Sequence, residues 1–298
     1  MLLDLPHLGQ ILALSCALSW AIAVILFRKS GETVSPVALN LFKSVLAFVL
    51  FVPTSLVLSV PLFPQTPPGD YLLLLASGIL GITLSDTLFF KSLNLLGAEL
   101  SAIVDCLYSP FIIGLSVLFL HESMTLIQVF GVVLIVSAVL SVSGLGSRKY
   151  ISRRDLALGI LFGVLAMATM AVGIVMIKPV LNRTSLLWAT QVRLFAGCSG
   201  LAVYVLFHPR RKQMVSSLLL VRNWRYMLPG SFIGAYLSMV IWLGGMKYTQ
   251  ASIASALNQT SNVFVFILAA ILLREPVTLI RVLAILLAFS GAFIVSFG

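Results

Sequence analysis

The chain has 298 residues, of which 60% are hydrophobic and only 9% are charged. Because soluble proteins carry about 25% charged residues, this composition excludes a water-soluble globular protein and predicts an integral membrane protein. The formal net charge of +10 does not indicate nucleic-acid binding, since the Lys and Arg residues form short clusters between apolar runs, as in loops beside anionic lipid.

Ten apolar runs follow one another along the chain. A helix that spans a bilayer needs about 20 predominantly apolar residues, and each run has close to that length or more. The sequence therefore predicts an all-α integral membrane protein with ten transmembrane helices, at about 8–28, 36–60, 71–94, 98–120, 124–143, 155–178, 184–207, 226–248, 251–273 and 278–297.

One part of the chain is repeated in the other half. The stretch 81–110 resembles 234–263, which lies 153 positions later, and this shift aligns Asp105 with Asn258. The first copy therefore carries an acid where the second carries an amide, and we expect the two copies to form facing walls of one cavity.

Two halves of five spans each follow from this alignment, residues 1–147 and 148–298. A second shift, of 150 positions, aligns Lys43 with Arg193. An odd number of spans per half gives the halves opposite orientations in the membrane, so we predict an inverted repeat. Carriers with this architecture bind substrate at the repeat interface near the bilayer midplane.

Four ionisable residues stand out inside the predicted spans: Lys43, Asp86, Asp105 and Arg193. Each costs free energy to insert, so each is a candidate for function with an expected partner. One interpretation is two structural ion pairs. The other is that Asp86 or Asp105 meets the substrate or a coupling proton, with Lys43 and Arg193 as secondary candidates.

Asp105 is the strongest candidate for the substrate site. On a continuous helix it shares a face with Ser101 and Tyr108. Pro110 removes a backbone donor nearby and is predicted to kink the helix, which frees a carbonyl. Asp86 lies deep in the preceding span.

Uncharged polar groups and aromatic rings complete the predicted cavity wall. Amides are costly against lipid but suit a wet cavity, and aromatic rings in mid-span do not fit an interfacial belt. Ordinary helix packing remains open for each aromatic ring. The predicted substrate-binding residues are Trp20, Asp86, Ser101, Asp105, Tyr108, Tyr236, Trp242, Asn258, Gln259 and Asn262.

Charged residues at the span ends have simpler interpretations. Lys91 and Glu99 could form a pair at the rim of the cavity. Glu122 and Glu275 precede apolar helices and could stabilise the N-terminal ends of those helices.

No catalytic or metal-binding spacing is present. The sequence has no H-E-x-x-H, no G-x-S-x-G and no Walker loop. An enzyme acting on lipid is therefore disfavoured, and we expect no cofactor and no metal.

Short motifs give the chain a family resemblance. Ala17-Leu18-Ser19-Trp20, Tyr108-Ser109-Pro110, His121-Glu122, Gly131 and Arg274-Glu275 resemble the ten-span EamA-type carriers of the drug/metabolite transporter superfamily. The resemblance implies a duplicated five-helix unit and alternating access without ATP. It implies a cavity lined by spans one, three, four, six, eight and nine, with spans five and ten at the periphery.

The chain departs from that family pattern in two ways. Val263 aligns with Pro110, so the ninth span is expected to be straighter than the fourth. Such carriers usually have cytoplasmic termini and a basic loop between spans two and three, but 61–70 contains no Lys or Arg. The distribution of loop charge instead places the termini outside.

The predicted function is secondary active transport of a small polar or amphipathic metabolite in a bacterial-type inner membrane. An amino acid or a related compound, moved outward, is the first expectation, with proton coupling as an option. The alternatives are a facilitative exchanger or uniporter, or a channel or sensor that does not transport. The carrier is expected to be a monomer or a homodimer.

Overall fold

The computed structural model describes residues 7–120, 125–143, 151–219, 221–248 and 251–297, and every regular element in these ranges is a helix. Six helical segments in this part of the chain are long and apolar enough to cross a membrane, and three shorter ones are also apolar. The segment 221–248 supplies the tenth crossing. The predicted all-α architecture with ten spans is confirmed.

The first repeat contains five spans, two of which are interrupted. Its elements are α1 (Leu8–Ser30), α2 (Pro36–Val57), a third span made of α3 (Pro68–Gly78), η1 (Ile79–Ser85) and α4 (Asp86–Leu96), a fourth made of α5 (Ala98–Asp105) and α6 (Tyr108–Leu120), and α7 (Leu126–Ser143).

The second repeat follows the same order with one added surface helix, α11. Its elements are α8 (Arg153–Val175) with the short α9 (Lys178–Leu181), α10 (Leu186–Phe207), α11 (Arg211–Leu219), an eighth span made of α12 (Val221–Ser231), η2 (Phe232–Leu237) and α13 (Ser238–Tyr248), then α14 (Ala251–Leu268) with η3 (Ala269–Leu273), and α15 (Leu279–Phe297).

Local sequence signals set several helix starts. The Ser35 hydroxyl accepts from the Ala38 N–H at 3.4 Å, and Pro36 occupies the first helical position of α2. Ser152 caps α8 in the same way by accepting from the Asp155 N–H at 3.0 Å. A cap and an early proline satisfy or remove backbone donors that a helix start leaves unpaired.

The two repeats share an unusual backbone feature. The π-helical turns η1 and η2 begin at Ile79 and Phe232, 153 positions apart. Gly81 and Gly234 lie within them. Short π-helical turns are rare and often mark functional sites, so their equivalent placement indicates that both halves use the same frame.

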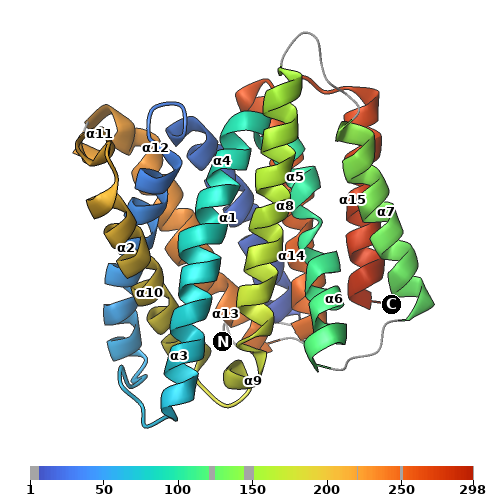
Figure 1. The fold of residues 1–298 in the computed structure, drawn as a ribbon. Coiled ribbons are helices and arrows are strands. Elements are labelled where there is room, and N and C mark those ends of the chain that lie inside the picture. The colour runs from blue at the N-terminus through green and yellow to red at the C-terminus, as the bar shows by residue number, and fades with distance from the viewer. Residues whose placement is uncertain (1–6, 121–124, 144–150, 220, 249–250, 298) are drawn as a thin grey trace.

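Each repeat packs its first helix against the other repeat. Helix α1 lies against α13 and α14, and α8 lies in the same way against α4, α5 and α6. At the right edge of Figure 1, α7 packs along α15, which confirms the peripheral position expected for spans five and ten. Gly291 permits this close approach, since a Cβ there would lie 2.6 Å from the Gly131 carbonyl oxygen.

The repeats run in opposite directions. Glu275, just beyond the end of η3, accepts hydrogen bonds from the first N–H groups of α5. The end of the ninth span therefore lies beside the start of the fourth, as an inverted repeat requires. Figure 1 shows both chain ends in its lower half and α11 at its upper end.

Candidate functional site

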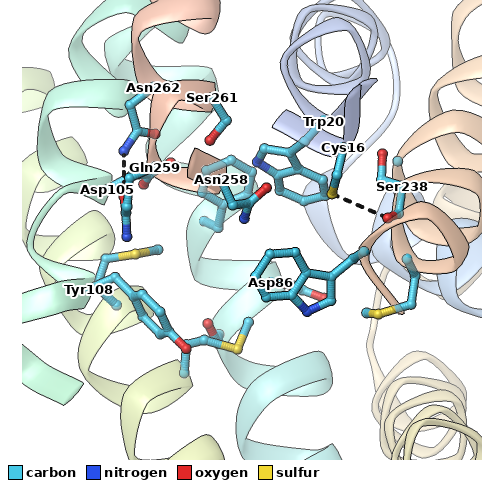
Figure 2. Close-up of a pocket in the computed structure, with 17 residues that line it drawn as sticks. Cys16, Trp20, Asp86, Asp105, Tyr108, Ser238, Asn258, Gln259, Ser261 and Asn262 are labelled. Carbon is cyan, nitrogen blue, oxygen red and sulfur yellow. Dashed lines mark hydrogen bonds between the residues drawn. The ribbon is translucent and has the colours of Figure 1, made fainter. Parts of the chain in front are cut away.

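A cavity of about 350 Å³ lies between the two repeats. Its walls come from α1, η1 and α4, α5 and α6, α8, η2 and α13, and α14, which are the six spans that the family resemblance implies. The described lining residues, most of them labelled in Figure 2, are Cys16, Trp20, Ser85, Asp86, Phe89, Asp105, Tyr108, Met167, Met170, Gly234, Ser238, Met239, Trp242, Asn258, Gln259, Ser261 and Asn262.

The structure brings eight of the ten predicted binding residues together at this cavity and places two elsewhere. Ser101 is 2% exposed and does not line it. The Tyr236 hydroxyl lies 2.7 Å from the Thr54 hydroxyl, and its ring packs edge-on against Phe51. Both residues therefore belong to helix packing. Tyr236 lies in the π-helical turn η2, which changes the face that a continuous α-helix would present.

Asp86 is neutralised by a lysine from the second span. The Lys43 Nζ donates to the Asp86 carboxylate at 2.6 Å, and Lys43 is 7% exposed. Lys43 and Asp86 therefore form one of the ion pairs that the sequence allows. Asp86 still borders the cavity, but its charge is balanced from behind.

Arg193, which aligns with Lys43 in the sequence, differs from it in its contacts. Its guanidinium reaches the η1 turn, where a Cβ on Gly81 would lie 3.0 Å from Nη2. Among the described residues its side chain has no ion pair, and its Nε is buried without a hydrogen bond. Arg193 is not among the described lining residues, but its charge interacts with two residues that are, Asp86 and Tyr108.

Asp105 lines the cavity without a protein partner. It is the last residue of α5 and is partly buried. Among the described residues no side chain forms an ion pair or hydrogen bond with its carboxylate. A carboxylate held in this way in a membrane interior is costly unless a ligand or a proton compensates it.

The fourth span breaks directly after Asp105. The Cys106 and Leu107 N–H groups bond to carbonyls three residues back, and α6 starts at Tyr108. Pro110 explains the break, since it has no N–H to bond the Cys106 carbonyl and its ring clashes there. The equivalent α14 runs without interruption from Ala251 to Leu268 and continues into the π-helical turn η3, so only the fourth span is broken at this position.

Amides from α14 bond to the broken segment. The Gln259 Nε2 donates to the Ser109 hydroxyl at 3.1 Å, and the Asn262 Nδ2 donates to the Cys106 sulfur at 3.3 Å. Gln259 and Asn262 are thus largely engaged in joining α14 to the break. Asn258 is different, because its Oδ1 is buried without a hydrogen-bond partner.

Aromatic and sulfur-containing side chains form the apolar part of the wall. The Trp20 and Phe89 rings stack with centroids 6.4 Å apart. Nine described lining residues were not among the predicted binding residues: Cys16, Ser85, Phe89, Met167, Met170, Gly234, Ser238, Met239 and Ser261. The signal was present for two of them, since Cys16 is four residues before Trp20 and Phe89 is three after Asp86, which places each pair on one helical face.

Buried ionic contacts join the repeats at one end of the cavity helices. The fully buried Glu99 accepts from the Arg281 guanidinium at 2.5 Å. The Glu275 carboxylate accepts from the Ala98 and Glu99 N–H groups, both at 2.9 Å. Gly97 leaves space for it, since a Cβ at that position would lie 2.7 Å from Glu275 Oε1.

These contacts correct two expectations from the sequence. The partner of Glu99 is Arg281 and not Lys91, whose Nζ lies 5.4 Å from the centroid of the Phe162 ring. Glu275 stabilises the N-terminus of α5, a helix of the other repeat, where an anion is favoured by the unpaired N–H groups. Its counterpart Glu122 lies outside the described residues.

Known proteins resemble the whole chain. The EamA-like transporter family matches it twice, at residues 7–144 and 157–297. An uncharacterized transporter of Archaeoglobus fulgidus is 24% identical over 274 residues, which is 90% of each chain. A solved crystal structure superposes with a TM-score of 0.67 at 16% identity, covering 96% of this chain and 95% of that one.

Proposed function

Because the chain belongs to the EamA-like transporter family, we propose that it is a secondary active carrier that moves a small polar or amphipathic metabolite by alternating access. The observation that supports this most is the cavity between two antiparallel repeats, into which Asp105 points its unpaired carboxylate. Sites at a repeat interface can be exposed to each side in turn when one repeat moves against the other.

The contacts of Glu99 and Glu275 form the closed gate in this proposal. They link α5 of the first repeat to the segment between α14 and α15 of the second. The carrier can open this end only by separating Glu99 from Arg281 and Glu275 from the α5 N-terminus. Such contacts are two-state elements, which alternating access requires.

An amino acid or a related compound is the substrate class that we propose. The cavity offers a carboxylate, amides and aromatic rings, and its volume lies within the range of small-molecule sites, about 300–1,000 Å³. We propose further that the substrate moves outward across a bacterial-type inner membrane. We place the boundary between the two repeats between residues 147 and 148.

Transport flux tests this function directly. The full chain, purified and reconstituted in liposomes, should show saturable counterflow of at least one compound in a screen of amino acids and related metabolites. Empty liposomes provide the control. Absence of flux for the entire screen contradicts the proposed carrier, and large single-channel currents would show a channel.

Proton coupling is assigned to Asp105 or Asp86 in this proposal. A pH gradient across the liposome membrane should drive uptake, and Asp105→Asn or Asp86→Asn should uncouple transport from that gradient. If both variants keep the pH dependence, the carboxylates do not carry the proton.

Membrane orientation follows in the proposal from the basic loops. Arg28, Lys29, Arg211 and Lys212 lie at the end of the molecule opposite both chain ends. The positive-inside rule assigns that end to the cytoplasm. A reporter fused after Gly298 should then read extracytoplasmic, and a cytoplasmic signal would contradict this orientation.

A further inference from the structure

The charges in the cavity are one-sided. Among the described lining residues there are two carboxylates, Asp86 and Asp105, and no Lys, Arg or His. The Lys43 ammonium balances Asp86 from outside the cavity at 2.6 Å. The carboxylate of Asp105 is therefore the charge that the described wall presents to a ligand without compensation.

A second acceptor without a partner lies in the equivalent position of the other repeat. Asn258 aligns with Asp105 under the 153-position shift and also lines the cavity. Its Oδ1 is buried and receives no hydrogen bond. A buried acceptor without a donor costs free energy, so both residues favour a ligand that brings hydrogen-bond donors.

The remaining wall suits the body of an organic cation. Trp20, Phe89 and Trp242 present aromatic rings, and Met167, Met170 and Met239 add polarisable sulfur. The face of an aromatic ring attracts a cation, and methionine adapts its shape to an apolar ligand. Such a wall accepts an aromatic or aliphatic group attached to a charged nitrogen.

We propose that the substrate is a small organic amine, whose ammonium group binds Asp105 and Asn258 and whose apolar body packs against the Trp20, Phe89 and Trp242 wall. This inference rests on the proposed transport function and narrows its substrate class. It places an amine ahead of an amino acid with the same body, and the amino acid ahead of the corresponding carboxylic acid.

The order follows from what a carboxylate would meet in the cavity. The ammonium of Lys43 is engaged with Asp86, and the Arg193 guanidinium lies at the η1 turn and is not among the described lining residues. A substrate carboxylate beside Asp105 would therefore be desolvated and would meet no cation among the described lining residues. A buried charge without a partner strongly disfavours binding.

Three probes with one aromatic body test the proposal: 2-phenylethylamine, phenylalanine and 3-phenylpropionate. Binding to the purified full chain is measured from the fluorescence of Trp20 and Trp242, which line the cavity, and flux is measured by counterflow in liposomes. We expect the amine to bind at least about tenfold more tightly than phenylalanine, because the carboxylate of phenylalanine would be buried without a cation on the lining. We expect no measurable binding of the acid, which lacks the ammonium that bonds to Asp105.

A matched pair of variants tests whether the amine binds at Asp105. Asp105→Asn keeps the shape of the side chain and should weaken amine binding at least about tenfold, since the ion pair is lost. Glu32→Gln, an acid-to-amide change at an exposed position paired with Lys29, should leave binding unchanged. The relative affinities of the three probes for the unaltered protein test the proposal even if a variant does not fold.

The possible outcomes separate this inference from the transport function. Flux of phenylalanine equal to or greater than that of the amine overturns the amine assignment and leaves the carrier function in place. Amine binding that is lost in Asp105→Asn but accompanied by no flux retains the site and contradicts the carrier. Amine binding that is unchanged in Asp105→Asn overturns the inference.

Discussion

The two repeats share a backbone frame but carry different charges. Their π-helical turns begin at equivalent positions, Ile79 and Phe232. Where the first repeat has Asp105 and Pro110, however, the second has Asn258 and Val263. The shared frame builds a cavity between the halves, while the unshared residues make one wall acidic and broken and the other neutral and continuous.

The two repeats also differ at the aligned starts of their last helices, α7 and α15, because aligned positions there carry different residues. Gln128 aligns with Arg281 and stays within its own helix start, where its Oε1 accepts from the Thr125 N–H at 3.0 Å and its N–H donates to the Thr125 hydroxyl at 3.1 Å. Arg281 instead reaches Glu99 of the other repeat. The Arg281 N–H still donates to the Thr278 hydroxyl at 3.4 Å, so the change from Gln to Arg keeps this part of the cap and adds a contact between the halves.

The largest effect is expected from separating the repeats at Arg281. Arg281→Met leaves the Glu99 carboxylate buried without its partner, and removing one member of a buried ion pair costs about 3–5 kcal/mol. The free energy of unfolding in detergent, from thermal or denaturant melts, measures this loss.

The equivalent substitution in the first repeat is the control for Arg281. Gln128→Met should cost about 1 kcal/mol, because it removes the side-chain acceptor of the Thr125 N–H and leaves the Thr125 hydroxyl cap in place. The double variant Arg281→Met with Glu99→Met should recover most of the loss. Equal destabilisation by Arg281→Met and Gln128→Met would show that the two aligned helix starts do not differ in the way that the structure indicates.

A similar comparison applies to the second and seventh spans. Lys43→Met should lower the free energy of unfolding by about 3 kcal/mol, since Asp86 loses its partner. Arg193→Met, at the aligned position, removes no ion pair among the described residues and should cost less. Melting curves of both variants give the difference, and a greater loss for Arg193→Met would reverse our assignment of the paired cation.

Exchanging the acid and the amide at the aligned positions 105 and 258 tests whether either repeat can supply the carboxylate that binds the substrate. Asp105→Asn should reduce amine binding at least about tenfold, and adding Asn258→Asp should restore about half of that loss on a logarithmic scale. The recovery is expected because the two positions border the same cavity and a charged hydrogen bond contributes about 1.5–3 kcal/mol. Fluorescence titration measures it, and no recovery would show that the first wall alone binds the substrate.

The smallest effect is expected at the helix cap made by Glu275. Glu275→Gln removes the negative charge at the N-terminus of α5 while one amide oxygen can still accept, so the loss should be about 1 kcal/mol. Hydrogen exchange at the Ala98 and Glu99 amides should become faster. Unchanged exchange would contradict the cap, and Glu32→Gln at the surface provides the control.

Much of the fold was predictable because it depends on the lengths and order of apolar runs. The break after Asp105 was predictable as well, since a proline acts on its own helix wherever that helix packs. Eight of ten predicted binding residues line the cavity for a similar reason: polar and aromatic groups in mid-span are costly against lipid and therefore face inward.

The pairing of the charges could not be predicted in full. Two acids and two bases lie in the spans, and sign balance allows either acid to pair with either base. The structure pairs Lys43 with Asp86 and leaves Asp105 without a protein partner. Partner choice depends on distances between helices, and no spacing along one helix encodes those distances.

The sequence by itself determined that this protein is a ten-span membrane protein with an inverted repeat, because hydrophobic length and local helix chemistry act within each segment. Only the tertiary structure decided that Glu99 pairs with Arg281, that Glu275 caps a helix of the other repeat, and that Ser101 and Tyr236 face away from the cavity. Each of these depends on how the helices of the two repeats pack against one another, and in lipid that packing is set by close contacts between helices.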